Sequence, residues 1–326
     1  MSPPPPATLA PEAPTKTSVA PSEPTPAQLK RAEENEQLVE AFSTTQLRWN
    51  NVDWIVTGYL ISVHLGCLAA PFFISWQAVV TCLVLHWFTC SIGICLGFHR
   101  YLAHRSLKLR KPAEFFVLAA GAISGEGSPL TWAATHRLHH QKSDQEGDPH
   151  SPVRDSTWWS HIGWLFPQRS NEQKQLLFRR YIPELAANKM LQFFERTYPL
   201  WLWGSGMALL GFGYLLSGWT GAIAMVVWGM CVRTTIAYHS TWFVNSATHL
   251  WGYRNYKTRD ESRNLWWVAI LSYGEGWHNN HHAHPSVAPA GHKWWEVDMT
   301  WWAIKLLRAT GMAYDVRTKV PAQPEG

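Results

Sequence analysis

Residues 54–99 read WIVTGYLISVHLGCLAAPFFISWQAVVTCLVLHWFTCSIGICLGFH and contain no Asp, Glu, Lys or Arg. This run has 46 residues, and a helix needs about 20 to cross a bilayer. Pro71 and the segment that follows it, up to Trp76, stand near its middle, where a turn is natural. We therefore predict two membrane spans, about residues 53–71 and 76–98, joined by a very short loop.

A second apolar block runs from Thr197 to Phe243, with Arg233 as its only full charge. Gly218, Trp219 and Gly221 mark a turn within it. Two further spans fit, about residues 198–216 and 220–240. The predicted fold is an all-α membrane protein, in which four transmembrane helices form two hairpins and a cytosolic helical cap carries the polar segments.

The distribution of charge predicts how these spans are oriented. Lys and Arg number 4 before the first span, 14 in residues 99–197 and 9 after Asn245, and the two hairpin turns carry none. Because positive loops stay in the cytoplasm, we expect both termini and the cap on that side. The net charge of +5 then needs only a membrane as partner, and no basic groove suggests nucleic acid.

Composition bounds the remaining organisation. Hydrophobic residues make up 46% of the chain and charged residues 16%, against about 25% charged in a typical soluble domain. Nine of the 21 prolines precede Gln28, and so polar a segment buries too little apolar surface to fold alone. We expect a disordered tail over residues 1–37 and one membrane domain over residues 38–326.

Histidines gather where the predicted spans leave the membrane. They form three boxes: HRYLAH with His99 and His104, HRLHH with His136, His139 and His140, and HNNHH with His278, His281 and His282. On a helix of about 100° per residue, positions i, i+3 and i+4 share one side, so each HxxHH box can aim three imidazoles at one site. His99 and His104 would stand about 140° apart on an ideal helix. Either the helix end bends, or the two serve different metals.

These boxes predict a metal centre. Imidazole ligates iron, zinc and copper, and no Asp or Glu lies inside the boxes, which excludes the carboxylate-containing iron sites. Eight or nine histidines suit two metals with open positions, and a diiron site is the economical interpretation. A membrane metal transporter is the alternative from another class, but it would need polar ligands in mid-membrane.

The motifs GFHRYLAHRS (97–106), THRLHHQKSD (135–144), NSATHLWG (245–252) and GEGWHNNHHAHP (274–285) resemble those of the membrane fatty acid desaturases of the stearoyl-CoA and Δ9 acyl-lipid type. The resemblance covers about residues 50–317 and is closest to the bacterial and plastid branch. It implies an enzyme that uses O2 and two electrons to place a cis double bond, at Δ9, in a saturated acyl chain carried by a lipid or by coenzyme A. A related acyl hydroxylase is the alternative within the same class.

The resemblance also implies the site residues. The two irons would be held by His99, His104, His136, His139, His140, His249, His278, His281 and His282, with Asn245 acting through a water. Leu83 and Trp87 on the second span would line the substrate tunnel. Apart from the resemblance, Asp144, Asp148 and Glu275 are carboxylates close to the boxes in sequence and could orient imidazoles from behind.

The expected partners are a fatty acyl substrate, the lipid bilayer and an external electron donor of the ferredoxin or cytochrome b5 type, because no heme-binding His-Pro-Gly-Gly occurs. The expected location is a bacterial inner membrane, with an endoplasmic reticulum or plastid membrane as the alternatives.

Overall fold

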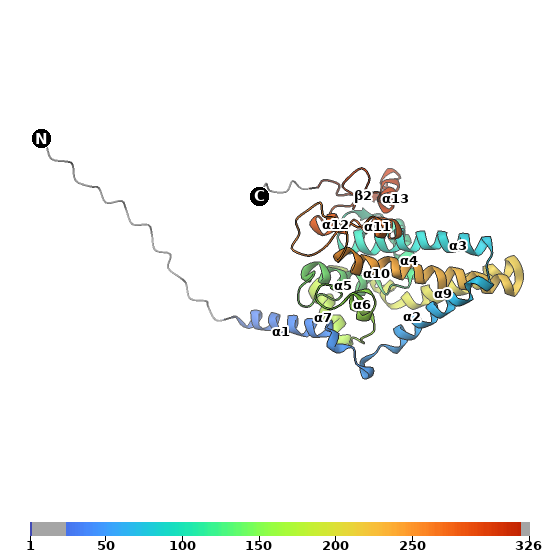
Figure 1. Ribbon diagram of the computed structural model, residues 1–326, viewed down its shortest axis with the longest axis horizontal. Coiled ribbons are helices and arrows are strands. Elements are labelled where there is room, and N and C mark those ends of the chain that lie inside the picture. Colours follow the sequence, from blue (N-terminus) through green and yellow to red (C-terminus); the bar gives the residue numbers. More distant parts are fainter. Residues whose placement is uncertain (2–23, 321–326) are drawn as a thin grey trace.

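The structure is a computed structural model that describes Met1 and residues 24–320. Long helices lie side by side in a narrow lobe, and shorter helices build a broader part beside it (Figure 1). We call the first part the stalk and the second the cap. The stalk contains α2 (Trp54–Gly66), η3 (Cys67–Phe72), α3 (Trp76–Trp87), η4 (Phe88–Ala103), α9 (Lys189–Val226), η6 (Val227–Val232) and α10 (Arg233–Ser246).

The cap is helical as well, apart from one two-stranded ladder. Its helices are α1 (Pro26–Ala41), η1 (Thr44–Gln46), η2 (Trp49–Asn51), α4 (Lys111–Ser124), α5 (Pro129–Lys142), α6 (Thr157–His161), η5 (Gly163–Leu165), α7 (Asn171–Tyr181), α8 (Pro183–Ala186), η7 (Ala247–His249), α11 (Trp266–Leu271), α12 (His278–Ala283) and α13 (Met299–Ala309). Strands β1 (Lys108–Leu109) and β2 (Ala313–Tyr314) pair antiparallel. They join the chain after the second apolar helix to the C-terminal segment.

Three continuous helical runs of the described residues are long and apolar enough to cross a membrane. Two of them, Trp54–Phe72 with 19 residues and Trp76–Ala103 with 28, coincide with the first two predicted spans. Ser75 caps the second run by accepting a hydrogen bond from the Ala78 amide. The protein is therefore a largely helical membrane protein, as predicted.

The third run, Lys189–His249, has 61 residues and holds both remaining predicted spans. A straight helix of that length would reach about 90 Å, three times the hydrocarbon thickness of a bilayer. The run is not straight, because Ser217 and Gly218 leave helical geometry, the latter at φ +61°. Beyond this point the chain returns along itself: a Cβ at Gly213 would collide with the Gly221 carbonyl. Residues 189–249 thus form a hairpin of two helices.

Close backbone contact joins the stalk to the cap. A Cβ at Gly93 of η4 would lie 2.5 Å from the Gly121 amide of α4, and Gly121 in turn faces the ring of Phe98. Only glycine permits this approach, which seats α4 directly on η4. The second apolar helix is thereby held against the cap over its last three turns, where the first histidine box begins.

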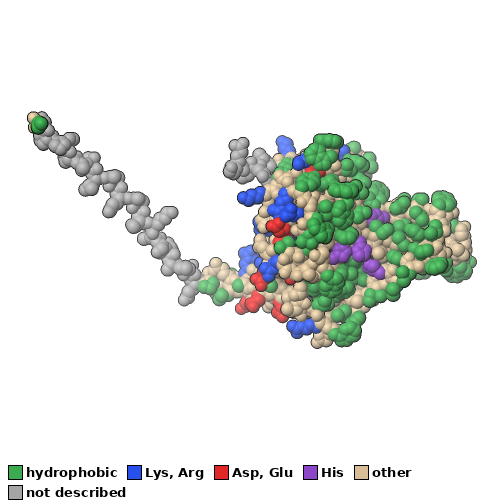
Figure 2. Space-filling model, viewed as in Figure 1, with side chains coloured by type: hydrophobic (Ala, Val, Ile, Leu, Met, Phe, Trp, Pro, Cys, Tyr) green, Lys and Arg blue, Asp and Glu red, His purple; other side chains and the backbone are tan. Residues whose placement is uncertain are grey.

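Charge follows the same division. In the view of Figure 2, Lys, Arg, Asp and Glu side chains cluster on the cap, whereas the stalk shows hydrophobic side chains with no charged ones. Histidines are visible where the two parts meet (Figure 2). This pattern is the one expected of a protein whose stalk lies in lipid.

The predicted disordered tail requires a correction. Residues 2–23 lie outside the described part, but Pro26–Ala41 form the helix α1. Thr25 and Gln28 form a reciprocal capping box at its start. Leu38 at its other end is buried in the cap core. The segment orders because its C-terminal turn docks on the cap, and no composition argument made on the tail alone includes that contact.

Candidate metal centre and substrate cavity

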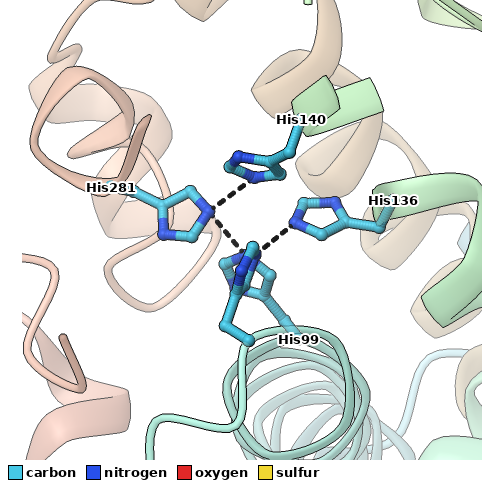
Figure 3. Close-up of side chains that lie close together, drawn as sticks. His99, His136, His140 and His281 are labelled. Carbon is cyan, nitrogen blue, oxygen red and sulfur yellow. Dashed lines mark hydrogen bonds between the residues drawn. The ribbon is translucent and has the colours of Figure 1, made fainter. Parts of the chain in front are cut away.

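Five histidines face one point at the base of the cap. Their ligand nitrogens all lie within 4.8 Å of one another, and they are His99, His104, His136, His140 and His281. The Nε2 atom of His281 lies 3.0 Å from that of His99 and 2.9 Å from that of His140. Figure 3 shows four of these rings converging: His136 and His140 from α5, His99 from η4 and His281 from α12.

The protonation state of these rings suits metal binding. Burial, followed by the neighbouring imidazoles, holds the pKa of His140 well below its ordinary value. The same two causes lower the pKa of His136 and of His281. Neutral imidazoles with converging lone pairs repel one another unless a cation lies between them, so this donor set fits a bound metal ion.

The helical winding of η4 answers the question left open for His99 and His104. Residues 88–103 form i→i+5 hydrogen bonds, and the His104 amide donates to the His99 carbonyl at 3.1 Å. Residues five apart in such a π-type helix lie one turn apart on the same side. The two ring centroids are 4.8 Å apart, so both imidazoles belong to one group.

A second group contains the other four predicted ligands, whose nitrogens again lie within 4.8 Å of one another: His139, His249, His278 and His282. The Nε2 atoms of His249 and His278 are 3.1 Å apart. The Nε2 atoms of His139 and His282 are buried and have no hydrogen-bond partner among the described residues. A buried nitrogen without a partner is costly, and a metal ion in this group would satisfy both.

Each HxxHH box supplies two ligands to one histidine group and one ligand to the other, and the group that receives two differs between the boxes. On α5, the i, i+4 pair His136 and His140 enters the five-membered group, and His139 enters the other. On α12, the i, i+4 pair His278 and His282 enters the four-membered group, and His281 crosses to the first. Each helix therefore contributes to both groups, which holds the groups side by side.

Every carboxylate predicted near the boxes contacts an imidazole. Asp148 lies 2.9 Å from Nδ1 of His139, Asp144 lies 2.8 Å from Nδ1 of His249, and Glu275 lies 2.8 Å from Nδ1 of His99. A carboxylate at Nδ1 fixes the proton there and leaves Nε2 free to bind a metal.

Asp260 is a fourth such carboxylate, which sequence analysis missed. It accepts from Nδ1 of His282 at 2.7 Å. It lies 22 residues before His282 in an irregular segment, and no spacing rule connects the two. Only the folded loop brings Asp260 behind the four-membered group.

Arg100 forms a second missed feature, a buried charge network behind the five-membered group. Its guanidinium, 2% exposed, bonds Glu275 at 3.1 Å and Asp298 at 2.8 and 3.0 Å. Burial alone would raise the pKa of the Glu275 carboxyl, but Arg100 and then His99 hold that pKa at about 2. Glu275 is thus a carboxylate, anchored on one side by Arg100 and facing His99 on the other.

A mostly apolar cavity lies beside both histidine groups. Its walls include Cys90 and Ile94 of η4, Thr241 and Val244 of α10, and Trp132 of α5. Four histidines also line it, His99 and His136 from the first group and His139 and His278 from the second. Asn245 lines the same cavity.

Glu126 lies behind the residues that line this cavity and bonds to two of them. Its carboxyl accepts hydrogen bonds from the Thr241 hydroxyl at 2.7 Å and from the Trp132 indole at 3.3 Å. Burial raises the pKa of Glu126 to about 7, although these two donors lower it. The pair of bonds fixes the orientation of two lining side chains from different helices.

The structure does not bring Leu83 and Trp87 to this cavity, and the predicted tunnel position needs correction. They are 61% and 44% exposed on the outer surface of α3. Cys82 and His86, each one residue earlier, are the buried positions. One residue is a rotation of about 100° on a helix, so the positions carried over from the resemblance fall on the outer side of α3.

Comparisons with known proteins agree with this architecture. The family model described as fatty acid desaturase matches residues 74–318. The chain is 41% identical over 288 residues to the sn-2 palmitoyl-lipid 9-desaturase of Nostoc sp. (strain 36), covering 88% of this chain and 95% of that protein. It is 41% identical over 269 residues to the sn-1 stearoyl-lipid 9-desaturase of Synechocystis, covering 81% and 80%. The chloroplastic palmitoyl-monogalactosyldiacylglycerol delta-7 desaturase of Arabidopsis thaliana is 40% identical over 282 residues, covering 85% and 72%.

Proposed function

Since the chain belongs to the fatty acid desaturase family, we propose that it places a cis double bond at Δ9 of a saturated acyl chain that is esterified in a membrane glycerolipid. The observation that carries this proposal is the cavity, whose lining is mostly apolar and includes histidines of both adjacent groups. The names of the Nostoc and Synechocystis relatives support both Δ9 and the lipid carrier.

We propose that both groups hold iron, with Asn245 contacting the centre through a water. The nine imidazoles supply neutral nitrogen donors, and four of them have a carboxylate at Nδ1. Zinc fits such donors but has no redox chemistry, whereas removing hydrogen from an unactivated carbon requires a metal–oxygen oxidant. Bound iron would supply that oxidation with O2.

The protein's own residues do the positioning. The overall reaction consumes one O2, two electrons and two protons, and converts –CH2–CH2– into –CH=CH– with two waters. The apolar walls of Cys90, Ile94 and Val244 exclude bulk water from the acyl chain. Asp148 keeps the proton of His139 on Nδ1, so Nε2 stays available throughout turnover.

We further propose four membrane crossings with both termini in the cytoplasm of a bacterial cell. The reversal at Ser217 and Gly218 supports two crossings within residues 189–249. The absence of Lys and Arg from both hairpin turns supports the orientation. Electrons then come from a cytoplasmic donor of the ferredoxin or cytochrome b5 type.

Expression in a desaturase-deficient host tests the reaction. We expect a monounsaturated acid with its double bond at Δ9, identified by gas chromatography with mass spectrometry of a double-bond derivative. In a pulse with a radiolabelled saturated acid, the labelled product should appear in glycerolipid before it appears in acyl-CoA. A hydroxy acid as product would contradict desaturation, and prior labelling of acyl-CoA would contradict the lipid carrier.

Replacing Asp260 by asparagine should weaken metal binding. Without the carboxylate, His282 loses the partner that fixes its ring and tautomer, and loss of such a partner typically costs about 10–100-fold in metal affinity or activity. Iron retained per chain after dialysis against a graded chelator measures the loss. Glu261→Gln is the matched control, because that neighbouring carboxylate pairs only with Arg254 and Arg263 at the surface. Equal retention in both variants would contradict the role of Asp260.

A further inference from the structure

Two cap segments contact the second apolar helix far from its cap end. The Tyr273 hydroxyl lies 2.6 Å from Nδ1 of His86, and the hydroxyls of Ser91 and Thr300 are hydrogen-bonded at 3.1 Å. His86 and Ser91 precede Ala103 by 17 and 12 residues, so both stand well before the cytoplasmic end of this helix. If hydrocarbon takes about 20 residues from Trp76 onward, both contacts lie at the depth of the acyl chains.

The helix α13, which contains Thr300, has one face without a partner among the described residues. Ile304 is fully buried in a core with Ile92 and Leu96 of η4. On the opposite face Trp302 and Leu306, at i and i+4, are 54% and 66% exposed. Figure 2 shows hydrophobic surface continuing from the stalk over the part of the cap where Figure 1 places α13.

The helix α11 ends shortly before Tyr273, and it too has one buried face and one exposed apolar face. Val268 and Ala269 are fully buried, whereas Trp266 and Ile270, again at i and i+4, are 62% and 55% exposed. Exposed apolar stripes on two separate helices, both next to residues that touch the second apolar helix at hydrocarbon depth, require an apolar neighbour.

We propose that α11 and α13 lie within the cytoplasmic leaflet of the bilayer, with Trp266, Ile270, Trp302 and Leu306 in contact with lipid. The inference rests on the proposed insertion of α3 and η4. Lys305 and Arg308 are exposed on α13 and can extend their charged ends to lipid headgroups, as basic residues of interfacial helices do. The occupant of both stripes is therefore lipid and not a protein partner.

A chain of hydrogen bonds connects α13, the helix proposed to contact lipid, to the histidine groups. The residue that caps α13 is Asp298, whose carboxylate accepts from the Trp301 amide and also holds Arg100. Arg100 in turn holds Glu275, which faces His99. Lipid contact at α13 thus fixes the depth of the third box relative to the cavity that delivers the acyl chain.

Photo-crosslinking in vesicles of phosphatidylcholine and phosphatidylglycerol tests the placement on the full chain. A benzophenone amino acid replaces Leu306 or Ile270 in separate variants, and lipid adducts are counted by mass spectrometry after illumination. Leu83, exposed on α3, is the control for lipid contact, and the exposed Glu172 of α7 is the control for water. Each variant is also assayed for desaturation.

We expect phospholipid adducts at Leu306 and Ile270 at a yield similar to that at Leu83, and loss of adducts at Glu172. Adducts at Leu83 with none at Leu306 and Ile270 would overturn the inference while leaving the proposed topology intact. Absence of adducts at Leu83 would overturn both. Desaturation by the labelled proteins is scored separately, so failure of the proposed reaction remains distinguishable.

Discussion

Replacing His139 by alanine should abolish the monounsaturated product and lower bound iron from about two ions per chain to about one, because a site that loses a ligand from a small set loses its metal first. His139 belongs to the group of four; Asp148 lies at one nitrogen of its ring, and no described residue bonds the other nitrogen. The three remaining ligands cannot replace the buried Nε2. The group of five, which does not include His139, should keep its metal.

Iron per chain and product by gas chromatography are measured on membranes that contain equal amounts of each protein. His284→Ala is the matched control. His284 is the residue directly after α12, and its ring contacts the ring of Tyr256 and belongs to neither histidine group. We expect the control to keep both iron and product. Persistence of the monounsaturated acid in His139→Ala would refute the assignment of the second group as a metal site.

Replacing Arg100 by methionine should lower the free energy of unfolding more than either Arg100→Lys or Arg105→Met. It would leave the carboxylates of Glu275 and Asp298 buried without their cation, and breaking a buried ion pair in this way typically costs about 3–5 kcal/mol. Arg100→Lys should restore only part of the loss, because an ammonium group cannot reproduce the planar, two-point bond to Asp298. Thermal unfolding of the metal-free protein in detergent measures the effect without involving catalysis.

Arg105, the residue directly after the first box, provides the control for the loss of a cation. Its guanidinium pairs with Glu184 at the surface, where both side chains are substantially exposed, and such pairs contribute about 0–1 kcal/mol. Arg105→Met should therefore unfold close to the parent protein. An equal loss of stability in Arg100→Met and Arg105→Met would contradict the inference that the buried Arg100 network stabilises the fold more than a surface ion pair does.

The fold was largely predictable because its signals are local. Hydropathy over residues 54–103 identifies two helices without knowledge of any partner, and the structure contains helices at 54–72 and 76–103. The turn within residues 189–249 was also predicted from its glycines, and the structure leaves helical geometry at Ser217 and Gly218, between the predicted spans 198–216 and 220–240. The start of α1 was missed, since its order depends on a distant docking surface.

The sequence predicted which histidines belong to the candidate site, but not how they divide between the two groups. HxxHH spacing shows which imidazoles share a helical face, and all nine predicted ligands lie in the two groups. Nothing in that spacing assigns His139 to one group and His140 to the other. Asp260 and Asp298 were invisible for the same reason: their partners are 22 and 198 residues away.

The amino-acid sequence alone determined where the chain is apolar, where its histidines stand and which family its motifs resemble, because each of these is a property of neighbouring residues. The tertiary structure alone decided how nine imidazoles divide into five and four, which carboxylates stand behind them and that Leu83 and Trp87 face outward. Those outcomes depend on contacts between distant segments and on the local i→i+5 winding of η4, which changes the side to which a side chain points without changing the pattern of residue types.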